Sequence, residues 1–196
     1  MYETLNVVYA SNDAFARHLG TSMCSLFDRN EGFSEIQVYV LSMGLTGESR
    51  ASLEEIAARY HRSLTFLEMG DLKDRFDHEV DLGGYDISIM LRLFMGEMLP
   101  QDVERVIYLD CDTVVAQPLK RLWREALCGN IIGAVMEPTI YEAVKESIGL
   151  GPEDAYYNSG VLLVDLKRWR EEHVQAGLWI SGKRRAESCL PATRML

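Results

Sequence analysis

The chain has 196 residues, which is enough for one domain with a sizeable core and too few for two comfortable ones. With 47% hydrophobic and 26% charged residues it has the composition of an ordinary globular protein, and no apolar run approaches the roughly 20 residues that span a bilayer. The net charge of −10 argues against a nucleic acid as partner and leaves at most a peripheral association with a membrane.

Short β-type apolar runs alternate with helix-like segments along the chain. Strands are expected at residues 5–10, 36–41, 64–67, 105–109, 131–136 and 161–164. Helices are expected up to about residue 28, from a capping box at Ser52 and Glu55 to about residue 61, and at 86–99, 141–148 and 167–179. The polar stretch 69–84 is expected to be a loop. This order predicts a single α/β/α domain, Rossmann-like, with a mostly parallel sheet flanked by helices.

The four cysteines include no CxxC pair and no metal-ligand spacing. In a chain of this size they are typical of reduced thiols, which predicts a cytoplasmic protein. The first residues also lack the basic and apolar regions of a signal peptide.

Two carboxylates follow the apolar run Val106–Leu109, at Asp110 and Asp112. In an open α/β sheet, ligands gather outside the carboxyl ends of the strands. Because strand side chains repeat every two residues, both carboxylates can face one ligand if the strand geometry persists. Two hard oxygen donors there suit Mn²⁺ or Mg²⁺ bridging a diphosphate. On the residues alone, a pair of aspartates in a turn after a strand is an equally good interpretation.

The run Leu109–Val114 also resembles the first motif of haloacid-dehalogenase-type phosphatases, in which the first aspartate is a nucleophile. That interpretation needs a later acidic cluster at the end of a strand. The candidates, Glu153 with Asp154 and Glu171 with Glu172, follow no convincing strand, and about 100 residues before the motif stay unexplained.

Three segments in order, at residues 7–13, 105–115 and 156–169, resemble glycosyltransferase family 8 over roughly residues 5–172. This family comprises retaining enzymes such as bacterial lipopolysaccharide galactosyl- and glucosyltransferases. The resemblance implies a GT-A fold, a UDP-sugar donor such as UDP-glucose or UDP-galactose, and a Mn²⁺ or Mg²⁺ cofactor. It also implies hexose transfer, with retention of configuration, to a saccharide or lipopolysaccharide-type acceptor.

The resemblance also assigns roles to individual residues. It implies that Asp110 and Asp112 bind the metal and that Arg92 and Asn158 take part in catalysis. The positions matching the donor site are Ala10, Ser11, Asn12, Phe15, Arg92, Asp110, Cys111, Asp112, Asn158, Ser159 and Gly160. Asn12 stands where many members have Asp, and residues 89–90 before Arg92 depart from the family pattern.

Each of these three positions also has an interpretation without a functional role. Phe15 would then be a core residue, Arg92 a surface charge, and residues 158–160 only a turn before a strand.

Two later motifs of the family, Asp-Gln-Asp and His-x-x-Gly-x-x-Lys-Pro-Trp, do not occur in this sequence. After about residue 172 the resemblance fades, and residues 181–196 hold four basic residues against one acidic residue. We therefore expect a nucleotide-sugar-binding domain over residues 1–180 that is incomplete at its C-terminal side, followed by a basic tail at 181–196. The alternative function is a truncated nucleotide-sugar-binding module with little or no turnover.

Overall fold

The computed structural model describes residues 3–70, 72–75, 86–137, 145–146 and 149–176. Its centre is one six-stranded sheet in the order β3-β2-β1-β4-β6-β5. The strands are β1 (Thr4–Asn12), β2 (Glu35–Met43), β3 (Ser63–Glu68), β4 (Arg105–Leu109), β5 (Ile132–Met136) and β6 (Tyr157–Asp165). Neighbouring strands from β3 to β4 are parallel, whereas β6 runs antiparallel to both β4 and β5. The predicted mostly parallel α/β sheet is confirmed, with the reversed strand β6 as an addition.

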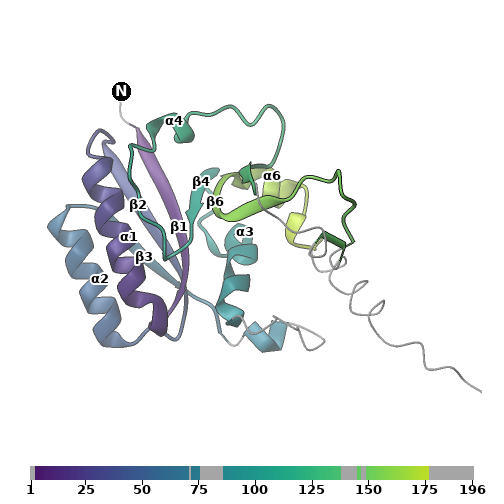
Figure 1. The fold of residues 1–196 in the computed structure, drawn as a ribbon. Helices are drawn as coiled ribbons and strands as arrows, with labels where there is room; N and C mark the ends of the chain where they lie inside the picture. Colours follow the sequence, from purple (N-terminus) through teal and green to yellow (C-terminus); the bar gives the residue numbers. More distant parts are fainter. Residues whose placement is uncertain (1–2, 71, 76–85, 138–144, 147–148, 177–196) are drawn as a thin grey trace, which may run out of the picture.

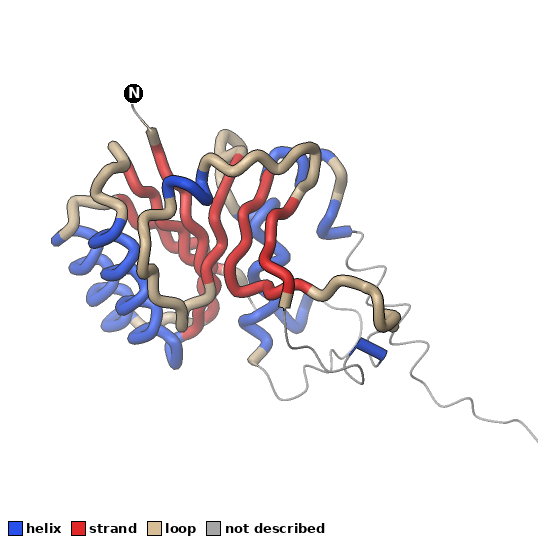
Figure 2. Tube along the Cα trace, turned by 45° about the horizontal axis from the view of Figure 1, so that its top comes forward, coloured by secondary structure: helices blue, strands red, loops and turns tan. Residues whose placement is uncertain are grey.

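Helices cover both faces of this sheet (Figures 1 and 2). One face carries α1 (Ala16–Arg29) and α2 (Gly47–Arg59), and the other carries α3 (Met95–Met98) and α6 (Leu166–Glu171). The short remaining elements are the 3₁₀ helices η1 (Asp13–Phe15), η2 (Leu72–Arg75) and η3 (Ile87–Phe94), and the helix α4 (Lys120–Trp123).

Strand β1 shows why this layering follows from the sequence. Leu5, Val7 and Tyr9 pack into the core beneath α1 and α2, while Val8 packs into the opposite core with Phe94. All five side chains are buried. A strand covered on both faces reads as a nearly continuous apolar run, here Leu5–Ala10 with Asn6 as the one polar residue.

Helix α2 begins earlier than its predicted capping box. The Thr46 hydroxyl accepts a hydrogen bond from the Ser49 N–H and caps the helix, so the first turn starts at Gly47. Ser52 lies inside the helix, where its hydroxyl donates to the Glu48 carbonyl oxygen. The prediction of a capping box at Ser52 is therefore wrong, because Thr46 supplies the cap one and a half turns earlier.

The predicted helix at 86–99 is confirmed as helical, but most of it is the tighter η3 and only Met95–Met98 is α-helical. The helix predicted at 167–179 is interrupted: α6 ends at Glu171, His173 takes a left-handed φ of 50°, and residues 174–176 are helical again. The predicted helix at 141–148 lies largely outside the described residues, as does the tail at 181–196. In the described part of the chain, no helix is long and apolar enough to cross a membrane.

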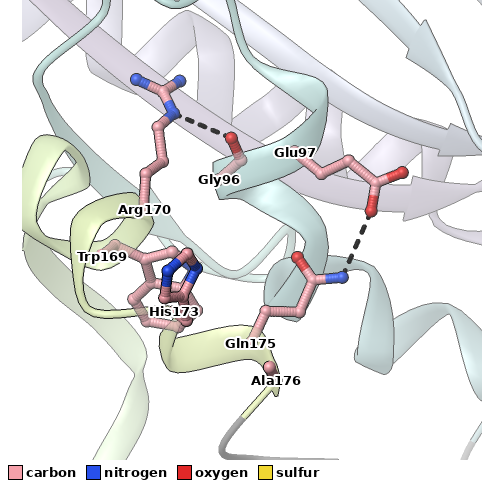
Figure 3. A pocket seen from close by; sticks show the side chains of 7 residues that line it. All are labelled: Gly96, Glu97, Trp169, Arg170, His173, Gln175 and Ala176. Carbon is pink, nitrogen blue, oxygen red and sulfur yellow. Dashed lines mark hydrogen bonds between the residues drawn. The ribbon is translucent and has the colours of Figure 1, made fainter.

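Arg170 fastens α6 to α3 (Figure 3). Its Nε donates to the Gly96 carbonyl oxygen at 2.8 Å, and its two terminal nitrogens donate to carbonyl oxygens of the chain between Leu99 and Val103. The carbonyl groups at the end of a helix lack partners within it, and a guanidinium can satisfy several of them at once. The segment that leads into β4 is thereby tied to the helix that follows β6.

Candidate functional site

A cavity of about 510 Å³ opens at the carboxyl ends of β1 and β4. Its lining residues are Ala10, Ser11, Phe15, Ser88, Ile89, Arg92, Tyr108, Asp110, Cys111, Asp112, Tyr156 and Ser159. The structure thus brings most of the predicted donor-site residues together, although they are spread over 150 positions of the sequence. Asn12, Asn158 and Gly160 are bonded to this group without lining the cavity themselves.

The reversed direction of β6 explains how residues 158–160 reach the carboxylates. Because β6 is antiparallel to β4, its beginning lies beside the end of β4, and the Asp110 N–H donates to the Gly160 carbonyl oxygen at 2.8 Å. A Cβ atom at position 160 would lie 2.8 Å from Asp110 Oδ2. A larger residue here would force the Asp110 carboxylate or the start of β6 to shift.

The strand geometry assumed for Asp110 and Asp112 does not persist. Strand β4 ends at Leu109, and the N–H and hydroxyl of Thr113 both donate to the Asp110 carbonyl oxygen, which closes a turn. Both carboxylates still line the cavity, and Asp112 is exposed. The turn itself therefore presents the pair on one side.

Cys111 lies between the two aspartates with its side chain buried. The thiol donates to the Ala10 carbonyl oxygen at 2.9 Å, which ties the turn to the end of β1. Burial raises the pKa of the Cys111 thiol to about 12, because the thiolate would lose its hydration. The side chain stays a neutral structural group at the floor of the site.

Arg92 extends from η3 to the same carboxylate. Its Nη2 pairs with Asp110 Oδ1 at 2.9 Å, and its Nη1 donates to the carbonyl oxygen and hydroxyl of Ser159 at 2.9 and 3.3 Å. Its Nε donates to the Ile89 carbonyl oxygen. Only 16% of the side chain is exposed, so the alternative of a solvated surface charge is wrong.

The end of β1 and the following η1 also line the cavity. The side-chain oxygen Oδ1 of Asn12 accepts a hydrogen bond from the Phe15 N–H at 3.3 Å. The side-chain nitrogen Nδ2 of Asn12 donates to the Ser88 hydroxyl at 3.4 Å. Asn12 thereby caps η1 and connects β1 to η3. Phe15 is 41% exposed and lines the cavity, which contradicts the alternative that it is a core residue.

Asn158 is held by its own neighbours. Its side-chain oxygen accepts from the Gly160 N–H at 2.8 Å, and its amide donates to Glu137 Oε2 at 3.3 Å. This arrangement fixes the beginning of β6 at Gly160, next to Asp110.

Four lining residues were not among the predicted site residues: Ser88, Ile89, Tyr108 and Tyr156. Tyr108 carried a usable signal, because it is a residue with a polar hydroxyl two positions before Asp110. Its hydroxyl donates to Asp110 Oδ1 at 2.7 Å. Burial raises the pKa of this phenol well above its usual value, so the hydroxyl keeps its proton as a donor.

The donor set fits a hard divalent cation in part. Asp110 and Asp112 offer carboxylate oxygens, the ligands that Mn²⁺ and Mg²⁺ favour, and diphosphate or water oxygens are the usual remaining ligands of such ions. Among the residues that the structure describes, no group of three or more His, Cys, Asp or Glu side chains is placed to hold a metal. Metal binding by Asp110 and Asp112 therefore stays a prediction, and the structure places both carboxylates at one cavity.

A second cavity, of about 320 Å³, lies between α3 and α6 (Figure 3). It is lined by Gly96, Glu97, Trp169, Arg170, His173, Gln175 and Ala176. None of the predicted site residues belongs to it, and among its polar groups Gln175 Nε2 donates to Glu97 Oε2.

Comparisons with known proteins agree with this geometry. A solved structure of the galactosyltransferase LgtC, in complex with donor and acceptor sugar analogues, superposes with a TM-score of 0.78 and 26% identity, covering 93% of this chain and 66% of that one. General stress protein A of Bacillus subtilis (strain 168) is 25% identical over 173 residues, which are 88% of this chain and 59% of the relative. A putative glycosyltransferase of Haemophilus influenzae is 26% identical over 176 residues, 88% of this chain and 52% of the relative. The chain thus spans between half and two thirds of the length of these proteins.

The six-stranded sheet and the cavity at its carboxyl edge define a domain of the GT-A glycosyltransferase type. The family model described as glycosyl transferase family 8 matches residues 6–189. The chain belongs to this family, and the match extends past residue 172, where the sequence motifs of the family end in this chain.

Proposed function

We propose that this chain binds a UDP-sugar together with Mn²⁺ or Mg²⁺ and transfers the hexose, with retention of configuration, to a saccharide acceptor. The observation that carries the proposal is the meeting of Asp110, Asp112 and Arg92 in one cavity at the carboxyl edge of the sheet. Membership of family 8 and the likeness to LgtC support the same reaction class.

The roles follow from what each group offers. A bound divalent cation would stabilise negative charge on the departing diphosphate as a Lewis acid. Asp110 and Asp112 would hold that ion, and Arg92 adds a fixed positive charge beside it. Ala10, Ser11 and Phe15 border the space for the base and ribose.

Strand β6 supplies the other side of the proposed donor site. Ser159 lines the cavity beside Arg92, and Asn158 and Gly160 fix the backbone next to Asp110. We assign the donor sugar to this side, with Arg92 and Asn158 nearest to the reacting carbon.

We favour UDP-galactose over UDP-glucose as the first donor to try, because LgtC is a galactosyltransferase. The acceptor is proposed to be a saccharide, with lipopolysaccharide-type glycans as one class. The incomplete domain over residues 1–180, the basic tail at 181–196 and a cytoplasmic location stay proposals as well.

Release of UDP tests the reaction directly. UDP-galactose and UDP-glucose should each be incubated with the chain and Mn²⁺, with and without excess EDTA. We expect release that requires the metal and that falls by about 10²–10³-fold in Asp110→Asn, the usual cost of losing one electrostatic group from a preorganised site. Metal-independent release, or an unchanged rate in Asp110→Asn, would contradict the proposal.

The second candidate function is nucleotide-sugar binding without transfer by these 196 residues. Its basis is that the chain spans only 59% and 52% of the two curated relatives, so groups needed for turnover can belong to the remainder of such proteins. Metal-dependent binding of UDP-galactose with no release of UDP would favour this candidate. A matched version extended with the C-terminal region of a longer relative should then regain release.

A further inference from the structure

Tyr108 contacts both Asp110 and Arg92, the two paired charged groups of the site. It lies on β4 with its side chain 1% exposed, and its hydroxyl donates to Asp110 Oδ1 at 2.7 Å. The Arg92 guanidinium carbon lies 4.8 Å from the centre of the same tyrosine ring, a distance at which a cation is attracted to the ring face. One buried side chain thus contacts both an anion and a cation of the cavity.

These contacts involve only one of the two carboxylate oxygens of Asp110. Oδ1 accepts from the Tyr108 hydroxyl and pairs with Arg92 Nη2 at 2.9 Å. Oδ2 lies on the Gly160 side, where a Cβ atom would come within 2.8 Å of it. With Oδ1 held by two donors, Oδ2 is the oxygen left to bind a ligand.

We propose that Tyr108 is a positioning residue that fixes the Asp110 carboxylate through its hydroxyl and the Arg92 guanidinium through its ring, so that Asp110 presents Oδ2 to the cation. This inference rests on the proposed function, because it assumes that Asp110 is a metal ligand. It assigns Tyr108 no contact with the reacting atoms.

The physical reason is preorganisation. A carboxylate that is free to rotate loses conformational freedom when it binds a cation, whereas one already oriented by a buried donor does not. Removing a residue that hydrogen-bonds to a metal ligand typically lowers metal affinity by about 10–100-fold. Phenylalanine would keep the ring beneath Arg92 and lose only the hydroxyl, so the two roles of Tyr108 can be separated.

The experiment measures two dissociation constants by calorimetry, for Mn²⁺ at saturating UDP and for UDP at saturating Mn²⁺. In Tyr108→Phe we expect the constant for Mn²⁺ to rise by about 10–100-fold, while that for UDP changes by less than about threefold. In Tyr108→Leu, which also removes the ring, both constants should rise. If the leucine variant does not fold, the phenylalanine variant alone decides.

A matched control comes from a tyrosine–aspartate pair at helices α1 and α2. The Tyr60 hydroxyl donates to Asp28 Oδ1 at 2.8 Å, the same kind of bond, and neither residue lines the cavity. Tyr60→Phe should leave both constants unchanged. Parental Mn²⁺ affinity in Tyr108→Phe, or an equal loss in Tyr60→Phe, would overturn the inference. If Asp110→Asn itself keeps full Mn²⁺ affinity, the proposed function fails instead.

Discussion

Gly160 sets how closely β6 approaches the carboxylate of Asp110. In Gly160→Ala the new Cβ would lie 2.8 Å from Asp110 Oδ2 and 3.2 Å from Asn158 Oδ1, so the carboxylate must move. We expect Mn²⁺-dependent binding of UDP to weaken by about tenfold or more, with a nearly unchanged circular dichroism spectrum. In the control Gly32→Ala, the added Cβ meets no atom within 4 Å, and binding should stay as in the parent. Equal affinity for UDP in the two variants would show that the Asp110 carboxylate can shift without loss of binding.

The Arg92 guanidinium serves three partners at once, which are the Ile89 carbonyl, Ser159 and Asp110. A lysine has the charge without the planar fork and cannot reproduce these bonds. Arg92→Lys should therefore weaken binding of the UDP-sugar by about 1–3 kcal/mol, the range for charge-assisted hydrogen bonds. Titration calorimetry measures the change, with Arg59→Lys on the exposed face of α2 as the control. Parental affinity in Arg92→Lys would leave Arg92 with a structural role only.

At single positions, the sequence was informative where a side chain belongs to a recognisable motif. Asp110, Asp112 and Arg92 were predicted and lie together in the cavity. Tyr108 was missed because an apolar strand ending in a motif is read as core, and the hydroxyl contact depends on the side-chain geometry of Asp110. The role of Asn12 as a cap of η1 likewise depends on where the chain turns after β1.

Among the secondary-structure elements, α3 and α6 make the tightest contact at a glycine. A Cβ atom on Gly96 would lie 2.6 Å from Trp169 Cδ1, and Trp169 is buried. Gly96→Ala should destabilise the fold by about 1–3 kcal/mol, the usual cost of overpacking. Urea denaturation measures the loss, with Gly47→Ala in α2 as a control, because a Cβ there meets no atom within 4 Å. Equal stability of Gly96→Ala and the parent would mean that α6 shifts freely.

The beginning of η3 predicts a pH dependence of stability. Hydrogen bonds from Ser88, first from its hydroxyl and then from its backbone N–H, lower the pKa of the capping residue Asp86. A group whose pKa is lower in the folded state stabilises the fold above its unfolded pKa of about 3.9, and this contribution is lost as the pH falls through the folded value.

Asp86→Ala should therefore be less stable than the parent at pH 5–7, and the difference should shrink as the pH falls below about 4. Denaturation curves over this pH range measure it, with Asp102→Ala at an exposed turn as the control. A difference that stays constant down to pH 2 would show that the charge of Asp86 does not contribute.

The order and type of most elements followed from apolar runs, but two features depend on tertiary structure. The reversal of β6 cannot be read from its own residues, because an apolar strand pairs equally well in either direction until its neighbours are known. The start of α2 was misplaced because Thr46 and Ser52 both suit a cap, and the turn after β2 decides between them.

On the scale of the whole molecule, the cavity lies where the separate parts of the fold meet. The ends of β1 and β4, the start of the reversed β6 and the 3₁₀ helix η3 each contribute side chains to it. The sheet order places β1 next to β4 and β4 next to β6, so these ends form one edge. The location of a site at this edge was predictable from general rules for α/β sheets, whereas the contribution of β6 and η3 to its lining required the topology.

The central claim is that Asp110 and Asp112 form a metal-dependent nucleotide site, and calorimetric titration with UDP tests it most directly. The parent, Asp110→Asn, Asp112→Asn and the control Asp102→Asn should each be titrated with and without Mn²⁺. We predict binding to the parent and to Asp102→Asn that requires Mn²⁺, and a marked loss of this binding in both site variants while their circular dichroism spectra stay unchanged. Undiminished Mn²⁺-dependent binding in both site variants would contradict the account.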